Sequence, residues 1–182
     1  MVNTYKLKLT PLQQEILRLL FIKVGSSLNQ RRISNYLSVS PPAVMKALPK
    51  LKKENLIIIN QDKESKRWSI ELNRDNNKVI PLKRVDNMKQ LYESGLNYFL
   101  DNEFAGATII LFGSYSKGED TEKSDIDIAI IGRKEKQVDL KYFEKLLERK
   151  ININFYDSFP KIHTHLKESL FNGIVLSGGV QL

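Results

Sequence analysis

The chain has 182 residues, of which 41% are hydrophobic and 27% charged, and it contains no cysteine. This composition is typical of a globular protein and excludes disulfides and thiolate metal sites. No stretch approaches the roughly 20 apolar residues of a membrane-spanning helix. The first residues lack the apolar centre of a signal peptide, so we expect a cytoplasmic protein.

The positive charge is concentrated in the first part of the chain. Residues 1–80 contain 15 Lys and Arg against 6 Asp and Glu, a net charge of +9, whereas residues 81–182 contain 14 against 15, a net charge of −1. A basic module beside a nearly neutral one predicts two small domains, the first with a polyanionic partner. Solubility alone is the alternative explanation for the charge.

Three short helices are expected in the basic part. The first begins at Thr10-Pro11, a capping residue followed by a first-turn proline. The second covers residues 29–37, and the third is capped by Ser40. Pro49 lies inside the third helix, where a proline costs about 3 kcal/mol and removes one backbone hydrogen bond. We therefore expect a kink or an early end near Leu48.

A β-hairpin is expected after these helices. Residues 56–59 form an apolar run, residues 60–67 are polar and charged, and residues 68–72 alternate as a returning strand. Trp68, at the start of the returning strand, is expected in the core.

Three helices followed by a basic hairpin resemble a winged helix-turn-helix domain, over residues 1–72. The resemblance implies binding of double-stranded DNA, with the third helix in a groove and the hairpin tip as a wing against the backbone. The positions that this resemblance places at DNA are Arg31, Arg32, Ser40, Ala43, Lys46, Lys50, Lys66 and Arg67.

The next segment joins the basic module to the rest of the chain. Residues 73–81 are polar, contain a proline at their end and are predicted to be a linker to a second domain, residues 82–182. From about Leu82 to Asn102, apolar residues recur at helical spacing and predict one long amphipathic helix. Its apolar stripe is expected to pack in a core; part of it is also a candidate dimer seam, so a homodimer stays open.

The chemistry is expected in residues 109–131. An apolar run predicts a buried strand, Gly113-Ser114 interrupts it, and a second apolar run carries Asp125 and Asp127. Carboxylates two residues apart on a strand point to the same face, and a hard cation such as Mg²⁺ commonly offsets their repulsion and brings phosphates with it. Gly113 lets a phosphate approach the backbone, and Ser114 opens a helix whose N–H groups face an anion.

Two aspartates in a solvated turn would be the alternative, but the isoleucines around them indicate a buried strand. Gly113-Ser114, ten residues and Asp125-Ile126-Asp127 resemble the Gly-Ser-x10-Asp-x-Asp signature of the minimal nucleotidyltransferases, in the DNA polymerase beta-like nucleotidyltransferase superfamily. The resemblance implies a small mixed sheet flanked by helices, and thus an α+β chain.

The resemblance also implies a nucleoside triphosphate substrate, with ATP as the first expectation, and Mg²⁺ or Mn²⁺ as the cofactor. It places the metal on Asp125 and Asp127 and the phosphates on Gly113 and Ser114. Lys117, in the following turn, is either a further phosphate ligand or a solvated surface lysine.

The superfamily usually carries a third carboxylate on the strand after the next helix. Here a helix is expected over residues 139–149 and a strand over residues 151–156, and the matching residue is Asn152. An amide binds metal weakly and cannot act as a base at neutral pH.

Two functions therefore stay open. One is transfer of a nucleotide to a protein or nucleic acid, since similar minimal enzymes modify a HEPN-type partner protein. The other is a catalytically weak or inactive regulator that senses nucleotide and binds DNA.

Overall fold

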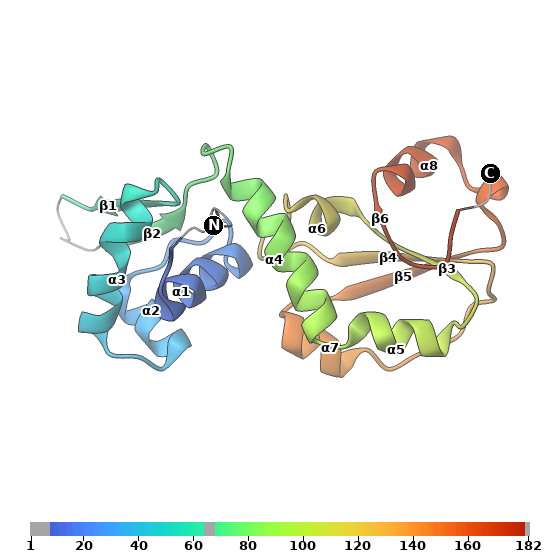
Figure 1. Ribbon diagram of the computed structural model, residues 1–182, viewed down its shortest axis with the longest axis horizontal. Helices are drawn as coiled ribbons and strands as arrows, with labels where there is room; N and C mark the ends of the chain where they lie inside the picture. The colour runs from blue at the N-terminus through green and yellow to red at the C-terminus, as the bar shows by residue number, and fades with distance from the viewer. Residues whose placement is uncertain (1–7, 64–67, 181–182) are drawn as a thin grey trace, which may run out of the picture. The chain divides into compact units, whose positions relative to one another are not determined.

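The computed structural model describes residues 8–63 and 68–180 (Figure 1). The chain divides into two compact units, Met1–Val79 and Ile80–Leu182. The first has three helices and a two-stranded sheet, and the second has a four-stranded mixed sheet with helices. The predicted α+β class is confirmed. Among the described residues, no helix combines the length and the apolar character needed to cross a membrane.

The first unit has the element order of a winged helix. Thr10 caps the first helix in a capping box with Gln13, whose side-chain oxygen accepts a hydrogen bond of 2.9 Å from the Thr10 backbone N–H. Ser40 caps the third helix. The two strands pair antiparallel, with Ile57 opposite Leu72. The elements are α1 (Pro11–Ile22), α2 (Gln30–Leu37), α3 (Pro41–Lys53), β1 (Ile57–Gln61) and β2 (Trp68–Leu72).

Two expectations for this unit are wrong. Of the kink or early end expected near Leu48, the early end is wrong, because the third helix continues through Pro49 to Lys53. Leu48 and Leu51 are both buried, and their packing offsets the hydrogen bond that Pro49 cannot make. Trp68, expected in the core, is 42% exposed, because it lies at the first position of β2, beyond the buried part of the strand.

The segment between Leu82 and Asn102 forms two helices where the sequence predicts one. These are α4 (Val79–Glu93) and α5 (Leu96–Glu103). Gly95 lies between them with φ +78°, in the left-handed region that interrupts a helix. Residues 79–81, which the sequence assigned to the linker, form the first turn of α4.

The second unit is built on one mixed sheet with the strand order β5-β4-β3-β6. β4 and β5 are parallel, and β3 pairs antiparallel with both β4 and β6. The strands are β3 (Thr108–Phe112), β4 (Ile126–Ile131), β5 (Ile151–Tyr156) and β6 (Ile174–Ser177). The remaining helices are α6 (Gly113–Lys117), α7 (Lys141–Leu147), the 3₁₀ turn η1 (Phe159–Lys161) and α8 (Thr164–Phe171).

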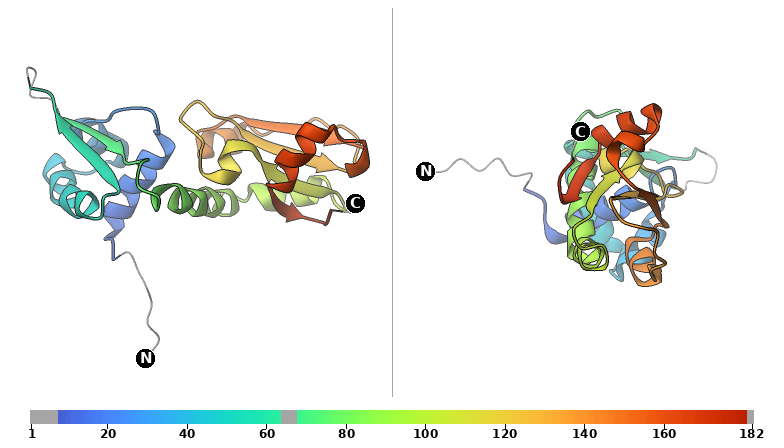
Figure 2. Two further views of the ribbon diagram at one scale, coloured as in Figure 1. Left: turned by 90° about the horizontal axis from the view of Figure 1, so that it is seen from above. Right: turned by 90° about the vertical axis from the view of Figure 1, so that its right-hand side faces the viewer.

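Both faces of this sheet are covered, as Figures 1 and 2 show. The face that carries Ile126, Ile128 and Ile130 packs against residues of α4, α5 and α7. The opposite face, which carries Ala129 and Ile131, packs against residues of η1 and α8. β4 is therefore buried except near its start, where Asp127 is half-buried at the end of the sheet.

Candidate functional site

Three polar residues meet at the end of the sheet where β4 and β5 begin. The strand register places Asp127 opposite Asn152 in the parallel pair and opposite Phe112 in the antiparallel pair. Asp125 directly precedes β4. Asp125 and Asp127 are half-buried, and Asn152 is exposed. The fold thus brings together the two carboxylates and the amide that the sequence singled out.

The side-chain amide of Asn152 bridges the two carboxylates. Its Nδ2 atom donates to Oδ2 of Asp125 at 3.0 Å and lies 3.4 Å from Oδ1 of Asp127. These two contacts partly offset the repulsion between the carboxylates of Asp125 and Asp127. Within residues 8–63 and 68–180, no group of three or more His, Asp or Glu side chains is placed to hold a metal ion. The available donors are therefore two carboxylates and one amide.

Gly113 directly faces this carboxylate pair. Its φ is +75°, and a Cβ added there would lie 2.6 Å from Oδ2 of Asp127. Both its backbone conformation and its contact with Asp127 therefore require glycine. The short helix α6 begins here; in it Ser114 is half-buried and Lys117 is exposed. Gly113, itself a predicted phosphate ligand, thus lies against Asp127, and the other two candidates, Ser114 and Lys117, follow it in α6.

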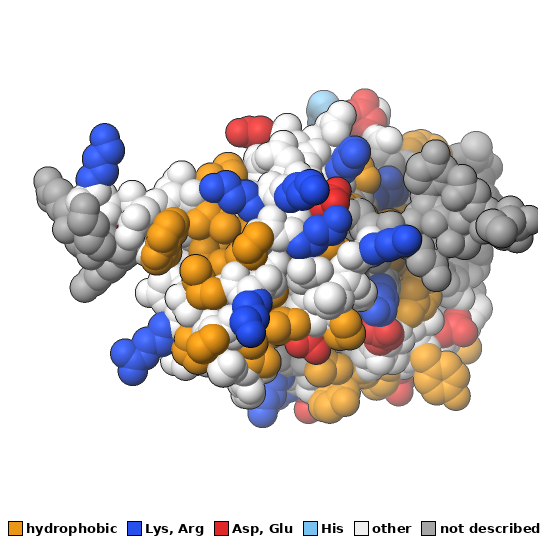
Figure 3. Space-filling view, turned by 60° about the vertical axis from the view of Figure 1, so that its left-hand side comes forward, with side chains coloured by type: hydrophobic (Ala, Val, Ile, Leu, Met, Phe, Trp, Pro, Cys, Tyr) orange, Lys and Arg blue, Asp and Glu red, His pale blue; other side chains and the backbone are white. Residues whose placement is uncertain are grey.

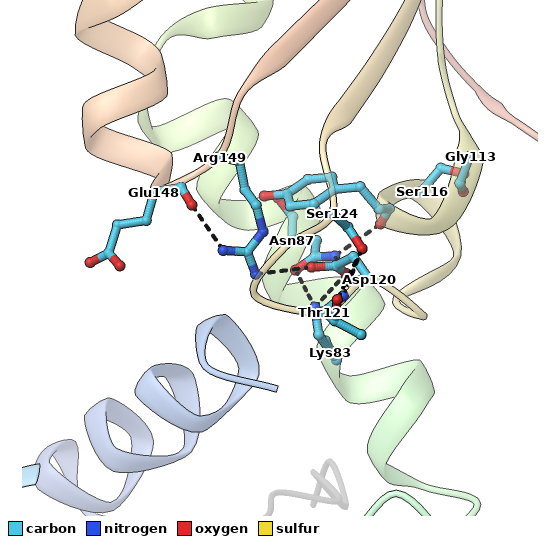
Figure 4. Close-up of polar contacts among 10 residues, drawn as sticks. Lys83, Asn87, Gly113, Ser116, Asp120, Thr121, Ser124, Glu148 and Arg149 are labelled. Atoms are coloured by element: carbon cyan, nitrogen blue, oxygen red, sulfur yellow. Dashed lines mark hydrogen bonds and ion pairs between the residues drawn. The ribbon is translucent and has the colours of Figure 1, made fainter. Parts of the chain in front are cut away.

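A buried ion cluster forms around Asp120, five residues before Asp125 in the chain (Figure 4). Asp120, in the loop between α6 and β4, is buried and pairs with Lys83 of α4 and with Nη2 of Arg149, the latter at 3.3 Å. Asn87 donates to Oδ1 of Asp120 at 2.7 Å and to the carbonyl of Tyr115 at 2.9 Å. The cluster connects α4, α6, the loop before Asp125 and the residues before β5.

Desolvation by burial is the main cause that lowers the pKa of Lys83 below its ordinary value, and the nearby Asp120 carboxylate partly opposes this effect. One buried carboxylate is thus shared by two cationic side chains, Lys83 and Arg149. Since removal of one partner would leave an uncompensated buried charge, the cluster fixes the loop that leads to the site.

Sequence reasoning missed this cluster. The buried positions of α4 include Val79, Lys83, Asn87 and Leu91, each four residues apart, and two of them are polar. Val85 of the same helix is apolar but 67% exposed, so hydrophobicity alone does not identify the buried positions. No local signal distinguishes Lys83 from a surface lysine, because its partner Asp120 is 37 residues away in sequence.

A cleft of about 500 Å³ opens beside Asp125. The end of the α6–β4 loop forms one side and α7 with the residues after it forms the other. Its lining residues are Glu122, Lys123, Ser124, Asp125, Lys141, Glu144, Lys145, Glu148, Arg149 and Lys150.

The residues expected at DNA are distributed over α2 and α3. Arg31, Arg32 and Lys46 are exposed. Ser40 accepts a capping hydrogen bond of 3.4 Å from the N–H of Ala43. Lys50, the other α3 lysine expected at DNA, pairs with Glu54 at 2.7 Å. The last two expected residues, Lys66 and Arg67, lie outside the described residues.

Solved structures similar to this chain include proteins named as a repressor and as a transcription regulator. A mutant form of Lactococcus lactis ZitR is 27% identical over 57% of this chain and 68% of its own, with a TM-score of 0.40. Streptococcus pyogenes AdcR is 24% identical over 56% and 69%, with a TM-score of 0.40. S. aureus MepR, in complex with DNA, is 23% identical over 52% and 79%, with a TM-score of 0.38. The winged-helix assignment of the first unit rests on its own helices and hairpin.

No protein of curated function matches the chain. The model of the nucleotidyltransferase domain family matches residues 94–176. This range contains the sheet, Gly113, the carboxylate pair and Asn152. Residues 94–176 are therefore a nucleotidyltransferase domain, preceded in this chain by a winged-helix unit.

Proposed function

We propose that the second unit binds a nucleoside triphosphate, with ATP as the first candidate, and transfers its nucleoside monophosphate to an acceptor. The observation that carries this proposal is the close approach of Gly113 to Asp127, which brings the start of α6 directly against one of the two carboxylates. Phosphates held by Gly113, Ser114 and Lys117 would then share one site with a metal held by Asp125 and Asp127.

The donor set fits one divalent cation. Asp125 and Asp127 offer the hard oxygen ligands that Mg²⁺ and Mn²⁺ prefer, within reach of the same Asn152 nitrogen. Rotation of the Asn152 amide would present its oxygen to a cation in place of its N–H group. A cation bound there would neutralise charge on the triphosphate and polarise the reacting phosphorus.

Asn152 limits the rate that this site can reach. A neutral amide adds no negative charge for a second cation and cannot accept a proton from the attacking hydroxyl. The chain's own carboxylates therefore bind and orient the nucleotide more effectively than they activate the acceptor. A nucleotide-sensing regulator that turns over slowly or not at all is the second candidate, favoured by the same Asn152.

The experiment that tests the first candidate uses full-length protein and NTP labelled at the α-phosphate. Transfer of label to the protein, a HEPN-type partner or a nucleic acid, lost in Asp127→Asn, supports a nucleotidyltransferase. Metal-dependent nucleotide binding without any transferred label, in Mg²⁺ and in Mn²⁺, supports the regulator.

We also propose that the first unit binds double-stranded DNA. The support is the excess of positive charge in residues 1–80 together with exposed Arg31, Arg32 and Lys46 on the helix pair α2–α3. Figure 3 shows Lys and Arg side chains with apolar side chains between them on the face in view. Such a mixture suits contacts with phosphates and with the edges of bases. A homodimer is compatible with this proposal, since paired half-sites are common among such domains.

A further inference from the structure

We propose that an exposed apolar surface of α5 and α7 joins two copies of this chain in a symmetric dimer. This surface, the α5–α7 surface, consists of Tyr98, Phe99, Tyr142, Phe143 and Leu146. It includes none of the residues assigned to nucleotide or to DNA, so the proposal is independent of both proposed activities.

Aromatic rings connect the two helices of this surface. α5 and α7 lie side by side against the same face of the sheet (Figure 1). The ring centroids of Phe99 and Phe143 are 5.0 Å apart, and the Tyr142 ring lies edge-on to the Phe143 ring at 5.3 Å. Because these rings are already packed against one another, less side-chain entropy is lost when a partner binds.

Three side chains of the surface face solvent although they carry large apolar groups. Tyr98, Tyr142 and Leu146 are 71%, 68% and 49% exposed. Tyr142 and Leu146 are four residues apart on α7 and therefore lie on the same side of that helix. Aromatic residues are enriched at protein–protein interfaces, and adjoining exposed apolar residues mark such sites. The α5–α7 surface thus has the composition of an interface.

The charges along α7 indicate that the partner is a second copy. Lys141 and Lys145 alternate with Glu144 and Glu148, so the helix and its C-cap residue carry no net charge. Both lysines are exposed, and neither forms an ion pair with a carboxylate of residues 8–63 and 68–180. Figure 4 shows the Glu148 carboxylate directed away from Asp120. A nucleic acid would require an excess of positive charge, which α7 does not have.

A two-fold axis near Glu144 pairs these charges with one another. The axis makes α7 antiparallel to its copy, so Lys141 lies opposite the partner's Glu148, and symmetry repeats the pair. The same axis places Tyr142 opposite the partner's Leu146. The seven residues of α7 span about 10 Å. The contact therefore extends onto the rings of α5, toward the roughly 800 Å² per partner of a stable interface.

The first test measures association of the full chain by sedimentation equilibrium. We expect wild type to dimerise and Leu146→Glu to dimerise at least about a hundredfold more weakly, because two central contacts are lost across the axis. Val85→Glu is the matched control, because Val85 lies on α4, outside the α5–α7 surface, and is 67% exposed. The control should dimerise as tightly as wild type.

The second test reverses charges and leaves the apolar residues in place. Lys141→Glu puts two carboxylates opposite each other at both ends of α7, and Glu148→Lys puts two ammonium groups there. Each variant alone should dimerise about tenfold more weakly than wild type. An equimolar mixture of the two variants should form a mixed dimer as tight as wild type, because each end then has one ammonium group and one carboxylate.

If Leu146→Glu fails to fold, as circular dichroism would show, Tyr142→Glu takes its place at a more exposed position. A wild type that stays monomeric, or a Leu146→Glu chain that dimerises as tightly as Val85→Glu, would overturn the α5–α7 surface. Lys141→Glu and Glu148→Lys chains that associate with each other no more tightly than with themselves would overturn the antiparallel pairing.

Discussion

The side-chain nitrogen of Asn152 lies 3.0 Å from a carboxylate oxygen of Asp125, and the same nitrogen lies 3.4 Å from Asp127. One neutral amide therefore holds two like charges at the end of a buried strand. With an amide at residue 152, the site has one negative charge fewer than a site with three carboxylates. Substitution of Asn152 by Asp tests the effect of that charge.

Asn152→Asp should bind Mg²⁺ or Mn²⁺ more tightly and transfer nucleotide faster than wild type. A third carboxylate supplies a ligand for a further cation and a group that can assist proton removal, an effect typically worth about 10²–10⁴ in rate. The measurement is the rate of label transfer from α-labelled NTP. Asn154→Asp, two residues further along β5, is the control with the same charge change. Equally brisk transfer by wild type and by Asn152→Asp would contradict the role assigned to residue 152.

In EDTA the same substitution should lower stability. Three carboxylates at one point repel each other, and the hydrogen bonds from the Asn152 amide are lost. We expect the Tm of Asn152→Asp to fall below that of wild type in EDTA and to recover on addition of Mg²⁺. A Tm that does not respond to metal in this variant would count against a cation at the carboxylate pair.

Gly113→Ala should disrupt the site through a direct contact. The added Cβ would lie 2.6 Å from Oδ2 of Asp127, and φ +75° is costly for alanine, by about 1–2 kcal/mol. Gly132→Ala is the matched control, because its φ is +86° but no atom lies within 4 Å of the added Cβ. Both variants should lose similar stability in urea unfolding. Only Gly113→Ala should lose Mg²⁺-dependent NTP affinity, by at least tenfold in calorimetry; similar affinities in the two variants would refute the contact.

Asp120→Asn should destabilise the second unit by about 3–5 kcal/mol, because it leaves buried Lys83 and Arg149 without their carboxylate. The double variant Asp120→Asn/Lys83→Met should recover part of this loss, since it removes one of the uncompensated charges. Asp139→Asn, at an exposed position, is the control. Urea unfolding followed by circular dichroism measures the differences, and an Asp120→Asn chain as stable as the control would exclude an energetic role for the cluster.

Lys83 should also give the protein a pH-dependent stability. Its pKa is lowered in the folded protein, so between that value and about 10.4 the unfolded chain binds more protons than the folded one. The free energy of unfolding of wild type, relative to Lys83→Met, should therefore rise as the pH increases through this alkaline window. Chemical unfolding at a series of pH values measures this difference. A difference that stays constant or falls as the pH rises would contradict the prediction.

DNA binding by the full chain should weaken steeply with salt, with a slope of about 0.9 log units per phosphate that the protein neutralises. If Lys66 and Arg67 bind phosphates, as the winged-helix proposal implies, Lys66→Ala/Arg67→Ala should weaken binding to all duplex sequences alike. The slope should fall by about 1.8 log units, the value for two phosphates. Lys161→Ala/Lys167→Ala, in the second unit, is the control. Electrophoretic shifts that stay constant from low to moderate salt would exclude this mode of binding.

Local signals in the sequence predicted much of the fold. Thr10 and Ser40 cap helices as expected, because a cap needs only a side chain three residues before its N–H partner. The alternation of isoleucines around Asp127 predicted a buried strand, and Gly113 predicted the end of the preceding apolar run, which is β3 and ends at Phe112. The single helix predicted over residues 82–102 is interrupted at Gly95, whose left-handed conformation the apolar periodicity did not reveal. Pro49 did not end α3, because tertiary packing outweighed local preference there.

The residue types and spacing around Gly113, Asp125 and Asp127 were enough to predict a phosphate and metal site, since spacing along strands and turns is set by the backbone itself. Only the tertiary structure decided which atoms meet. The parallel register of β4 and β5 directs the Asn152 nitrogen to both carboxylates, and the fold buries Lys83 against Asp120, 37 residues away. Such contacts join residues distant in sequence, and the free energy that selects them comes from packing and burial, which no local pattern encodes.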